Sequence, residues 1–278
     1  DTLALSSAGK IAEKRLHELC GKFGGRAVLE TFQALFDRAR DTMLQLIRLL
    51  PDEPVSFTDV LDYDGVIDAP LTIHLTLHRK GDKVVLDYTG SSPQCEGPMN
   101  IPLNPSLQKM RLYNVLRLAA GQKIDIDPQL DANQGVEDLV EVRIPDDCFL
   151  KPTYPAPVSL RHLSGGRLGE VMQGILAQIF PDTIPATANG SLNCYSLLGV
   201  GRKPEDRWLC FEVTAAGGGG RPFGDGIDAY CFNNRLKNAP VEFVETVYPV
   251  RVEQYSLRPG SSGAGKHRGG YGLIRAIR

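Results

Sequence analysis

The amino-acid sequence predicts an α+β fold: a helical hairpin, then a mixed α/β region, then a glycine-rich, β-rich half. Three observations support this class. Apolar residues recur at every third or fourth position through the first 50 residues, alternate with polar residues from Leu71 to Leu77, and become sparser where glycine accumulates. More than half of the 29 glycines lie after residue 185. We therefore expect a helical hairpin over 1–53, an α/β region over 54–164, and a β-rich region with a leading helix over 165–278.

Two helices are expected at the start of the chain. Residues 5–23 carry one apolar face, Gly24 and Gly25 interrupt the pattern, and a second helix continues to Pro51. A break of two residues between long helices favours an antiparallel hairpin. Such a pair could pack against a sheet or a neighbouring subunit.

The remaining elements follow from the same two periodicities. Alternating patterns indicate half-buried strands, and a return to helical spacing indicates helices. Helices are expected at 105–120 and 165–180. Strands are expected at 54–63, 71–78, 83–88, 139–144, 192–200, 208–214 and 247–257.

The composition is that of an ordinary globular protein, with 42% hydrophobic and 23% charged residues. The net charge of −2, without a basic run, predicts no nucleic-acid partner and no anionic membrane partner. No apolar run approaches the ~18 residues that cross a bilayer, and no signal peptide is visible. The six cysteines lack C-x-x-C spacing. We expect free, buried thiols and a cytoplasmic protein.

Histidine is scarce, and its spacing does not favour a metal site. His74 and His78 lie on one expected strand, where four residues span about 13 Å. That separation is too large for two ligands of one ion, so both are expected on the polar face of the sheet. His162, next to Arg161 before a helix, is a better site candidate. We expect no metal in this chain.

The run from Gly217 to Gly220 is the most unusual local sequence. Four consecutive glycines are costly to order unless the backbone bends sharply or approaches something closely. A P-loop would need Lys and then Ser or Thr after the last glycine, but Arg221 and Pro222 follow. A Rossmann turn would need a helix start, which is also missing. We therefore expect a tight loop that lines or supports an active-site cleft.

Carboxylates near this loop are candidates for acid–base chemistry. Asp225 and Asp228 lie in the same loop, and Glu242 and Glu245 lie one helical turn apart downstream. Capping and solvated charge are the alternative interpretation.

Seven short motifs follow one another along the whole chain. They are D-Y-T-G-S-S-P-Q from Asp87, G-P-M-N ending at Asn100, P-A-P-V from Pro155 with Arg161 after it, the segment from Pro181 to Gly190, Glu212 with Gly217-Gly218-Gly219 and Asp225-Gly226, N-A-P-V-E from Asn238 with Glu245 and Tyr248-Pro249, and S-G-A-G from Ser262 with Arg268-Gly269-Gly270 and Gly272. In this order they resemble the hydantoinase B family. That family includes the B half of ATP-dependent 5-oxoprolinase, N-methylhydantoinase, and subunits of the acetone and acetophenone carboxylases.

The chain also departs from the family pattern. Members usually begin with a histidine and aspartate cluster that is expected to bind a divalent metal, and they continue past the final glycine motif. Neither feature is present between Asp1 and Arg278, so we expect a central-to-C-terminal piece of a longer protein. Tyr230-Cys231 stands where the family pattern has a histidine.

The resemblance implies a division of labour. A hydantoinase A-type, kinase-like partner would phosphorylate a small cyclic amide with Mg-ATP, and the B-type subunit would assist hydrolytic ring opening. The expected assembly is a homo- or hetero-oligomer, with this piece inactive alone. A subunit of an ATP-dependent ketone carboxylase and a non-catalytic scaffold for the A-type partner are the alternatives.

The same resemblance implies the site residues. The candidates for catalysis are Arg161, Asp225 and Glu245. The candidates for substrate binding are Ser91, Asn100, Gly217, Gly218, Gly219 and Arg268. Backbone N–H groups of the glycine run would stabilise developing negative charge.

Overall fold

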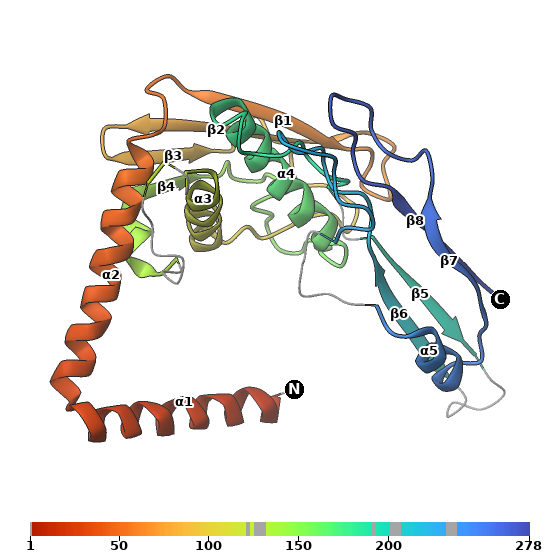
Figure 1. The fold of residues 1–278 in the computed structure, drawn as a ribbon, viewed down its shortest axis with the longest axis horizontal. Helices are drawn as coiled ribbons and strands as arrows, with labels where there is room; N and C mark the ends of the chain where they lie inside the picture. Colours follow the sequence, from red (N-terminus) through yellow and green to blue (C-terminus); the bar gives the residue numbers. More distant parts are fainter. Residues whose placement is uncertain (1, 121–122, 125–131, 191–192, 201–206, 232–237) are drawn as a thin grey trace. The chain divides into compact units, whose positions relative to one another are not determined.

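A computed structural model describes residues 2–120, 123–124, 132–190, 193–200, 207–231 and 238–278. Its mixture of helices and small sheets confirms the predicted α+β class (Figure 1). The chain forms two compact units, and each is discontinuous in sequence. The division into 1–53, 54–164 and 165–278 stays a prediction. The first unit contains Asp1–Leu50, Lys80–Val84 and Ser106–Glu141; the second contains Pro51–Arg79, Val85–Pro105 and Val142–Arg278.

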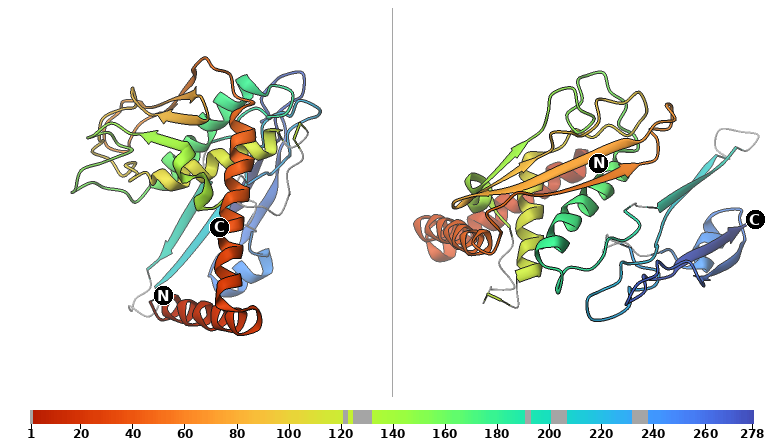
Figure 2. Two further views of the ribbon diagram at one scale, coloured as in Figure 1. Left: turned by 90° about the vertical axis from the view of Figure 1, so that its left-hand side faces the viewer. Right: turned by 90° about the horizontal axis from the view of Figure 1, so that it is seen from above.

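The first unit begins with two long helices, α1 (Thr2–Phe23) and α2 (Gly25–Ile47). Only Gly24 separates them, with φ 86° and ψ 138°. A helical hairpin needs a loop of about 2–5 residues to reverse the chain, so α1 and α2 diverge instead of packing side by side (Figures 1 and 2). The antiparallel packing expected from the sequence is therefore not seen, and α1 has no buried residue.

The core of the first unit is formed by the second half of α2 together with α3 (Pro105–Ala120) and the short 3-10 helix η1 (Gln134–Leu139). Its fully buried larger side chains include Met43, Leu46, Ile47, Leu112, Tyr113 and Leu116. Leu107, which the periodicity places on the apolar face of α3, is 60% exposed. An ion pair of 2.8 Å between Lys109 and Glu137 ties α3 to η1.

Four strands form one sheet in the order β1 (Val55–Leu61), β2 (Leu71–Lys80), β3 (Lys83–Asp87) and β4 (Val140–Arg143). β1 runs antiparallel to β2, from Val55 opposite Leu77 to Leu61 opposite Leu71. The apolar residues of β2 are buried and the intervening His74 is half-buried, as the alternation predicts. The ring of His74 contacts Thr58 Oγ1 at 2.7 Å.

Helix α4 (Arg161–Ile179) packs on β1. Gly174 makes this contact close, because a Cβ at this position would lie 2.7 Å from the ring of Phe57. The helix begins at Arg161 instead of near residue 165, and Ser164 and Gly166 are buried within it. Arg161 and His162 therefore belong to its first turn.

The glycine-rich half contains two antiparallel hairpins. β5 (Asn193–Gly199) pairs with β6 (Trp208–Thr214), and β7 (Val252–Arg258) pairs with β8 (Gly272–Ile277). Helix α5 (Val241–Val247) precedes β7, so the strand expected from residue 247 begins only at Val252. The described loop segments 217–226 and 259–271 are rich in glycine, as the sequence predicts.

Candidate functional site

An open cleft of about 1220 Å³ lies within the second unit. The first turn of α4, the start of β5 and the glycine run line it, together with segments 184–189 and 258–275. Three of the residues predicted to bind substrate, Gly217, Gly218 and Gly219, are among them.

Helix α4 positions the wall of this cleft. Gln173 Nε2 donates to the carbonyls of Pro185 and Ala186 at 2.9 and 3.0 Å. Glu170 accepts the N–H of Ala188 at 3.0 Å. Burial raises the pKa of the Glu170 carboxyl, although this backbone hydrogen bond opposes the shift. The N–H of Ala186 in turn donates to the carbonyl of Gly220 at 2.8 Å, so α4 holds the glycine run through one intermediate segment.

Close backbone packing explains why this run consists of glycine. A Cβ on Gly217 would collide with the carbonyl of Gly270, and one on Gly219 would collide with the carbonyl of Ala186. Gly218 has more room, because its nearest neighbour, the carbonyl of Ile227, would be 3.3 Å away. The sequence predicted the close approach, and the structure shows that the partners are other backbone segments.

The glycine run also offers hydrogen-bond donors to the cleft. The N–H of Gly218 is occupied by the carbonyl of Ile227 at 2.9 Å. Within the described residues, the N–H groups of Gly217, Gly219 and Gly220 have no hydrogen-bond acceptor. All three residues are partly exposed and line the cleft. Unpaired backbone N–H groups of this kind can bind an anion or a developing oxyanion.

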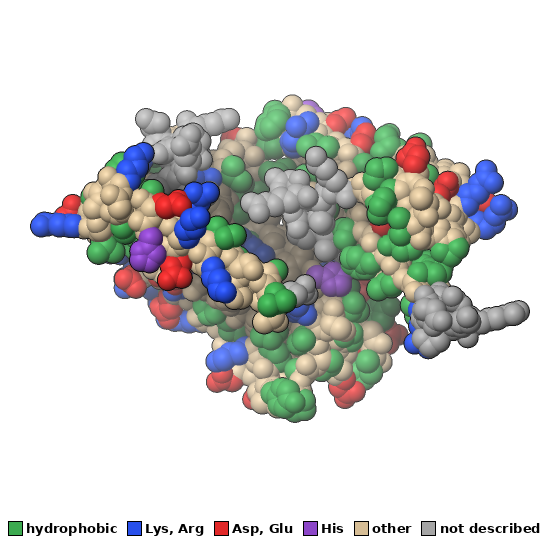
Figure 3. Space-filling view, turned by 90° about the horizontal axis from the view of Figure 1, so that it is seen from below, with side chains coloured by type: hydrophobic (Ala, Val, Ile, Leu, Met, Phe, Trp, Pro, Cys, Tyr) green, Lys and Arg blue, Asp and Glu red, His purple; other side chains and the backbone are tan. Residues whose placement is uncertain are grey.

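Among the described residues, the charged side chains that line the cleft are all basic. They are Arg221, Arg258, Lys266 and Arg275, and no described Asp or Glu lines the cleft. Charged side chains of both signs are instead interspersed over the surface that Figure 3 shows. Cations in a concave site raise the local concentration of an anionic ligand. The lining therefore favours a negatively charged ligand.

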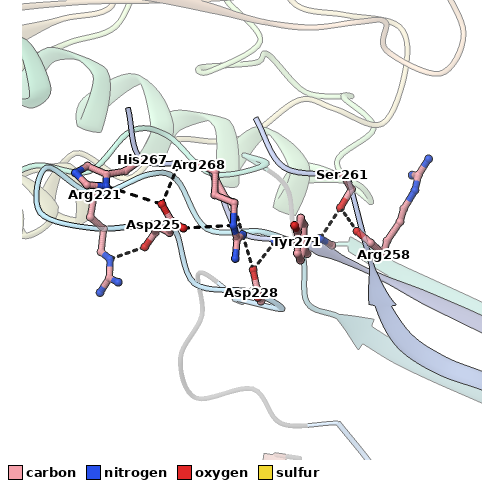
Figure 4. Close-up of polar contacts among 10 residues, drawn as sticks. Arg221, Asp225, Asp228, Arg258, Ser261, His267, Arg268 and Tyr271 are labelled. Carbon is pink, nitrogen blue, oxygen red and sulfur yellow. Dashed lines mark hydrogen bonds and ion pairs between the residues drawn. The ribbon is translucent and has the colours of Figure 1, made fainter. Parts of the chain in front are cut away.

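The predicted residues Asp225 and Arg268 lie behind this lining, in a polar cluster that Figure 4 shows. Asp225 accepts the backbone N–H of Arg268 at 3.0 Å, and its second oxygen lies 3.4 Å from Arg268 Nε. The guanidinium of Arg268 also donates to Asp228 at 2.9 Å and stacks on the ring of Tyr271 at 4.2 Å. The hydrogen bond from Arg268 holds the pKa of Asp228 below its usual value.

Asp225 is connected to the cleft through His267, which lines it. His267 Nδ1 lies 3.9 Å from an oxygen of Asp225 (Figure 4). Asp225 and Arg268 therefore stand next to the cleft without lining it themselves, and their roles stay predictions.

Ser91 and Asn100 are engaged in the fold elsewhere in the second unit. Ser91 Oγ accepts the N–H of His74 at 3.1 Å and also contacts its carbonyl, which fixes the loop after β3 to β2. Asn100 is fully buried, and its amide bonds the backbone of Cys95, Gly97 and Pro157. The polar side-chain atoms of both residues therefore form hydrogen bonds with backbone groups, and their contact with substrate stays a prediction.

Arg161 and Glu245 also lie outside the lining. The guanidinium of Arg161 bonds the carbonyl of Val158 at 3.1 Å, just before the first turn of α4. Glu245 on α5 accepts the N–H of Val252 at 2.8 Å, at the start of β7. Their predicted catalytic roles stay predictions.

The structure adds Cys194, Tyr195 and Arg275 to the cleft lining, and it also places His162 there, which the sequence favoured as a site candidate. Cys194 Sγ, at an exposed position, lies 3.7 Å from Nε2 of His162, and both residues line the cleft. All six cysteines are free as expected, but only Cys95, Cys148 and Cys210 are buried. A pair of strand residues, Tyr195 and Arg275, lines the cleft as well. No local motif marks these residues, because their partners are distant in sequence.

The described residues contain neither a cluster of metal-ligating side chains nor a membrane-spanning helix. In these parts of the chain, no three His, Cys, Asp or Glu side chains come together in an arrangement that could hold a metal ion. They therefore offer no site that fits the divalent metal implied by the resemblance. None of the helices within the described ranges is long and apolar enough to span a bilayer.

The sequence profile described as Hydantoinase B/oxoprolinase matches residues 1–278. The chain belongs to the hydantoinase B/oxoprolinase family. All of it aligns with 47% of a putative D-/L-hydantoinase B-type subunit from a Pseudomonas species at 30% identity. It also aligns, over 94% of its length and 38% of the relative, with the acetophenone carboxylase delta subunit of Aromatoleum aromaticum at 24% identity.

The fold of this hydantoinase B-family chain is also found in a solved structure. The ATP-dependent caprolactamase from Pseudomonas jessenii superimposes with a TM-score of 0.82 and 25% identity, over all of this chain and 48% of the caprolactamase chain. The chain thus spans about half the length of the hydantoinase relative and of the caprolactamase chain.

Proposed function

We propose that this chain is part of a B-type subunit of an ATP-dependent cyclic amidohydrolase of the hydantoin or 5-oxoproline type. An A-type partner would phosphorylate the amide oxygen with Mg-ATP, and the cleft would receive the phosphorylated ring for hydrolysis. Phosphorylation makes a poor electrophile reactive and adds negative charge. The proposal rests on family membership together with the names of the hydantoinase and caprolactamase relatives.

The observation that carries the proposal is the cleft lining. Four cationic side chains, no carboxylates among the described residues, and three unpaired N–H groups of the glycine run surround one cavity. An uncharged ring alone would need none of these cations. A ring that carries a phosphoryl group would be attracted by them, and the N–H groups would bind the phosphoryl oxygens, whose charge grows when the phosphate leaves after water has added to the ring carbon.

The residue best placed to accept a proton from the attacking water is His267. It lines the cleft, and Asp225 lies on its Nδ1 side at 3.9 Å. A carboxylate there stabilises the imidazolium that forms when the other ring nitrogen accepts a proton. In this proposal Asp225 is a positioning residue that acts through His267, and Arg268 holds Asp225 in place.

The test uses the full-length protein together with its A-type partner. ATP-dependent ring opening of hydantoin, 5-oxoproline or caprolactam is expected, and His267→Gln should lower kcat at least about 100-fold with a small change in Tm. His162→Gln is the matched control, since it also removes a lining imidazole, but no described carboxylate forms an ion pair with it. Absence of ring opening for every cyclic amide would overturn the proposal.

A ketone carboxylase subunit is the second candidate function. The 24% identity to the acetophenone carboxylase delta subunit favours it, and an anion-binding cleft would also suit a phosphorylated enol and bicarbonate. Bicarbonate-dependent consumption of a ketone by the same complex, with no ring opening, would establish this alternative.

A further inference from the structure

Arg275 occupies an unusual position in the cleft wall. It lies on β8, and its side chain is only 5% exposed. It lines the cleft together with Tyr195 of β5. A guanidinium carries five N–H donors and stays charged at any physiological pH, so its burial requires acceptors for those donors.

The described residues do not supply these acceptors. Nε and Nη1 of Arg275 are buried and have no hydrogen-bond partner. Nη2 lies 2.8 Å from Oε2 of Glu212, in an ion pair whose geometry does not form a hydrogen bond. Oε1 of Glu212 is also buried without a donor. Ordinarily a buried guanidinium is satisfied by carboxylate or carbonyl oxygens, so acceptors are missing at both Nε and Nη1.

Three neighbours fix the direction of the guanidinium. Glu212, 7% exposed on β6, holds the Nη2 side. The hydroxyl of Tyr195 donates to the same Glu212 oxygen. Burial, and then this hydrogen bond, raise the pKa of Tyr195 well above its usual value, so the phenol remains a donor. The ring of Tyr255 lies 4.6 Å from the guanidinium carbon, opposite Arg275 on β7. The unpaired N–H groups of the guanidinium are therefore held in one orientation.

We propose that Arg275 is the anchor of an oxyanion subsite in this cleft, which takes a phosphoryl or carboxylate group of the ligand through its unpaired N–H donors. Two oxygens of such a group match the two parallel N–H donors along one edge of a guanidinium, and none of the three nitrogens of Arg275 has a hydrogen-bond partner among the described residues. The nitrogens are already shielded from bulk water, so little further desolvation opposes binding once the lining side chains admit the anion. Arg258 and Lys266, which also line the cleft, attract the same charge.

The anion subsite deepens the proposed function, because it names the group by which the ligand is held. Only the identity of the ligand depends on the proposed function. The subsite itself follows from the unpaired donors and the cationic lining, and it can be tested without the partner or ATP.

The experiment is calorimetric titration of the full-length protein with inorganic phosphate, and separately with acetate, at constant ionic strength. Arg275→Lys keeps the charge but loses the two-pronged geometry, and it should weaken anion binding at least about 10-fold. Arg278→Lys is the matched control, because it makes the same change at an exposed arginine that pairs with Glu253 outside the cleft lining, and it should leave affinity nearly unchanged. Tighter binding of phosphate identifies a phosphoryl subsite, and tighter binding of acetate identifies a carboxylate subsite.

Glu212→Gln provides a second test that does not depend on folding of the first variant. Removal of this carboxylate leaves the charge of Arg275 uncompensated, so the attraction of its unpaired donors for an anion should increase. We expect tighter phosphate binding than in the wild type, and a larger rise in Tm when phosphate is added.

Equal phosphate affinity in wild type and Arg275→Lys, with no effect of phosphate on the Tm of Glu212→Gln, would show that Arg275 is only a structural ion-pair partner. Failure of the proposed function has a different signature. Phosphate binding that depends on Arg275, in a complex that opens no cyclic amide, would leave the anion subsite standing and overturn the function.

Discussion

Replacement of Gly219 by alanine tests the backbone packing of the cleft. A methyl group at Gly219 would occupy the place of the carbonyl oxygen of Ala186 and would also lie 2.8 Å from that of Thr187. Both contacts are with backbone, so no side-chain rotation can relieve them. The glycine run must therefore move away from segment 184–189, which α4 holds through Gln173 and Glu170.

The expected magnitudes follow from this displacement. Overpacking of a rigid site costs about 1–3 kcal/mol, and the upper end applies because backbone is the obstacle. For a chain of this size, about 3 kcal/mol corresponds to a Tm lower by roughly 6–12 °C. A shift of about 1 Å in the N–H donors of the run should lower turnover about 100-fold.

The assay is turnover of the full-length complex together with thermal unfolding. Gly263→Ala is the matched control, because Gly263 also lines the cleft but has no atom within 4 Å of an added Cβ. It should change Tm by less than about 2 °C and leave turnover nearly normal. Gly218→Ala should give an intermediate effect, since its nearest neighbour would stand 3.3 Å away. Similar behaviour of all three variants would refute the packing argument.

Two further predictions concern charge and nucleotide. Asp64 is only 2% exposed, and this burial acts to raise the pKa of its carboxyl. Hydrogen bonds from the N–H groups of Ile67, Gly97 and Val66 outweigh the effect of burial, so the pKa lies below its usual value of 3.8. A lowered folded-state pKa stabilises the protein above the unfolded pKa, and the stability is lost as pH falls. Asp64→Asn should therefore cost about 1–3 kcal/mol near pH 7, and the gap to wild type should narrow below about pH 4 in urea unfolding; a gap independent of pH would contradict this. Calorimetric titration of this chain with Mg-ATP should show no tight binding, because no nucleotide motif follows the glycine run, and micromolar affinity would be the opposite result.

Local periodicity was sufficient to predict most elements of the fold. The alternation from Leu71 to Leu77 and the helical spacing at 105–120 depend on neighbours within a few residues, and the structure confirms both. The divergence of α1 and α2 was missed because the sequence placed both Gly24 and Gly25 in the break, whereas Gly25 already begins α2 and only Gly24 separates the helices. The early start of α4 was missed because its two glycines at 165–166 resemble a boundary.

The candidate site could be predicted only in part. Consecutive glycines are costly, so Gly217 to Gly220 stood out in the sequence, and they do line the cleft. The buried pair of Arg275 and Glu212 joins strands 63 positions apart, and no short motif marks it. Which N–H groups remain free is likewise set by tertiary packing, as the contact from Gly218 to Ile227 shows.

The backbone frame of the cleft has a consequence for how relatives can differ in substrate. Gly217 packs directly on the carbonyl of Gly270, and Gly219 packs directly on the carbonyl of Ala186. Substitution of either glycine therefore cannot adjust the width of the cavity by small steps. Variation in ligand shape must therefore be accommodated by side chains that project from this fixed frame, such as Leu160, Asn189 and Thr214. Libraries that alter substrate range should randomise those positions and keep the glycines constant.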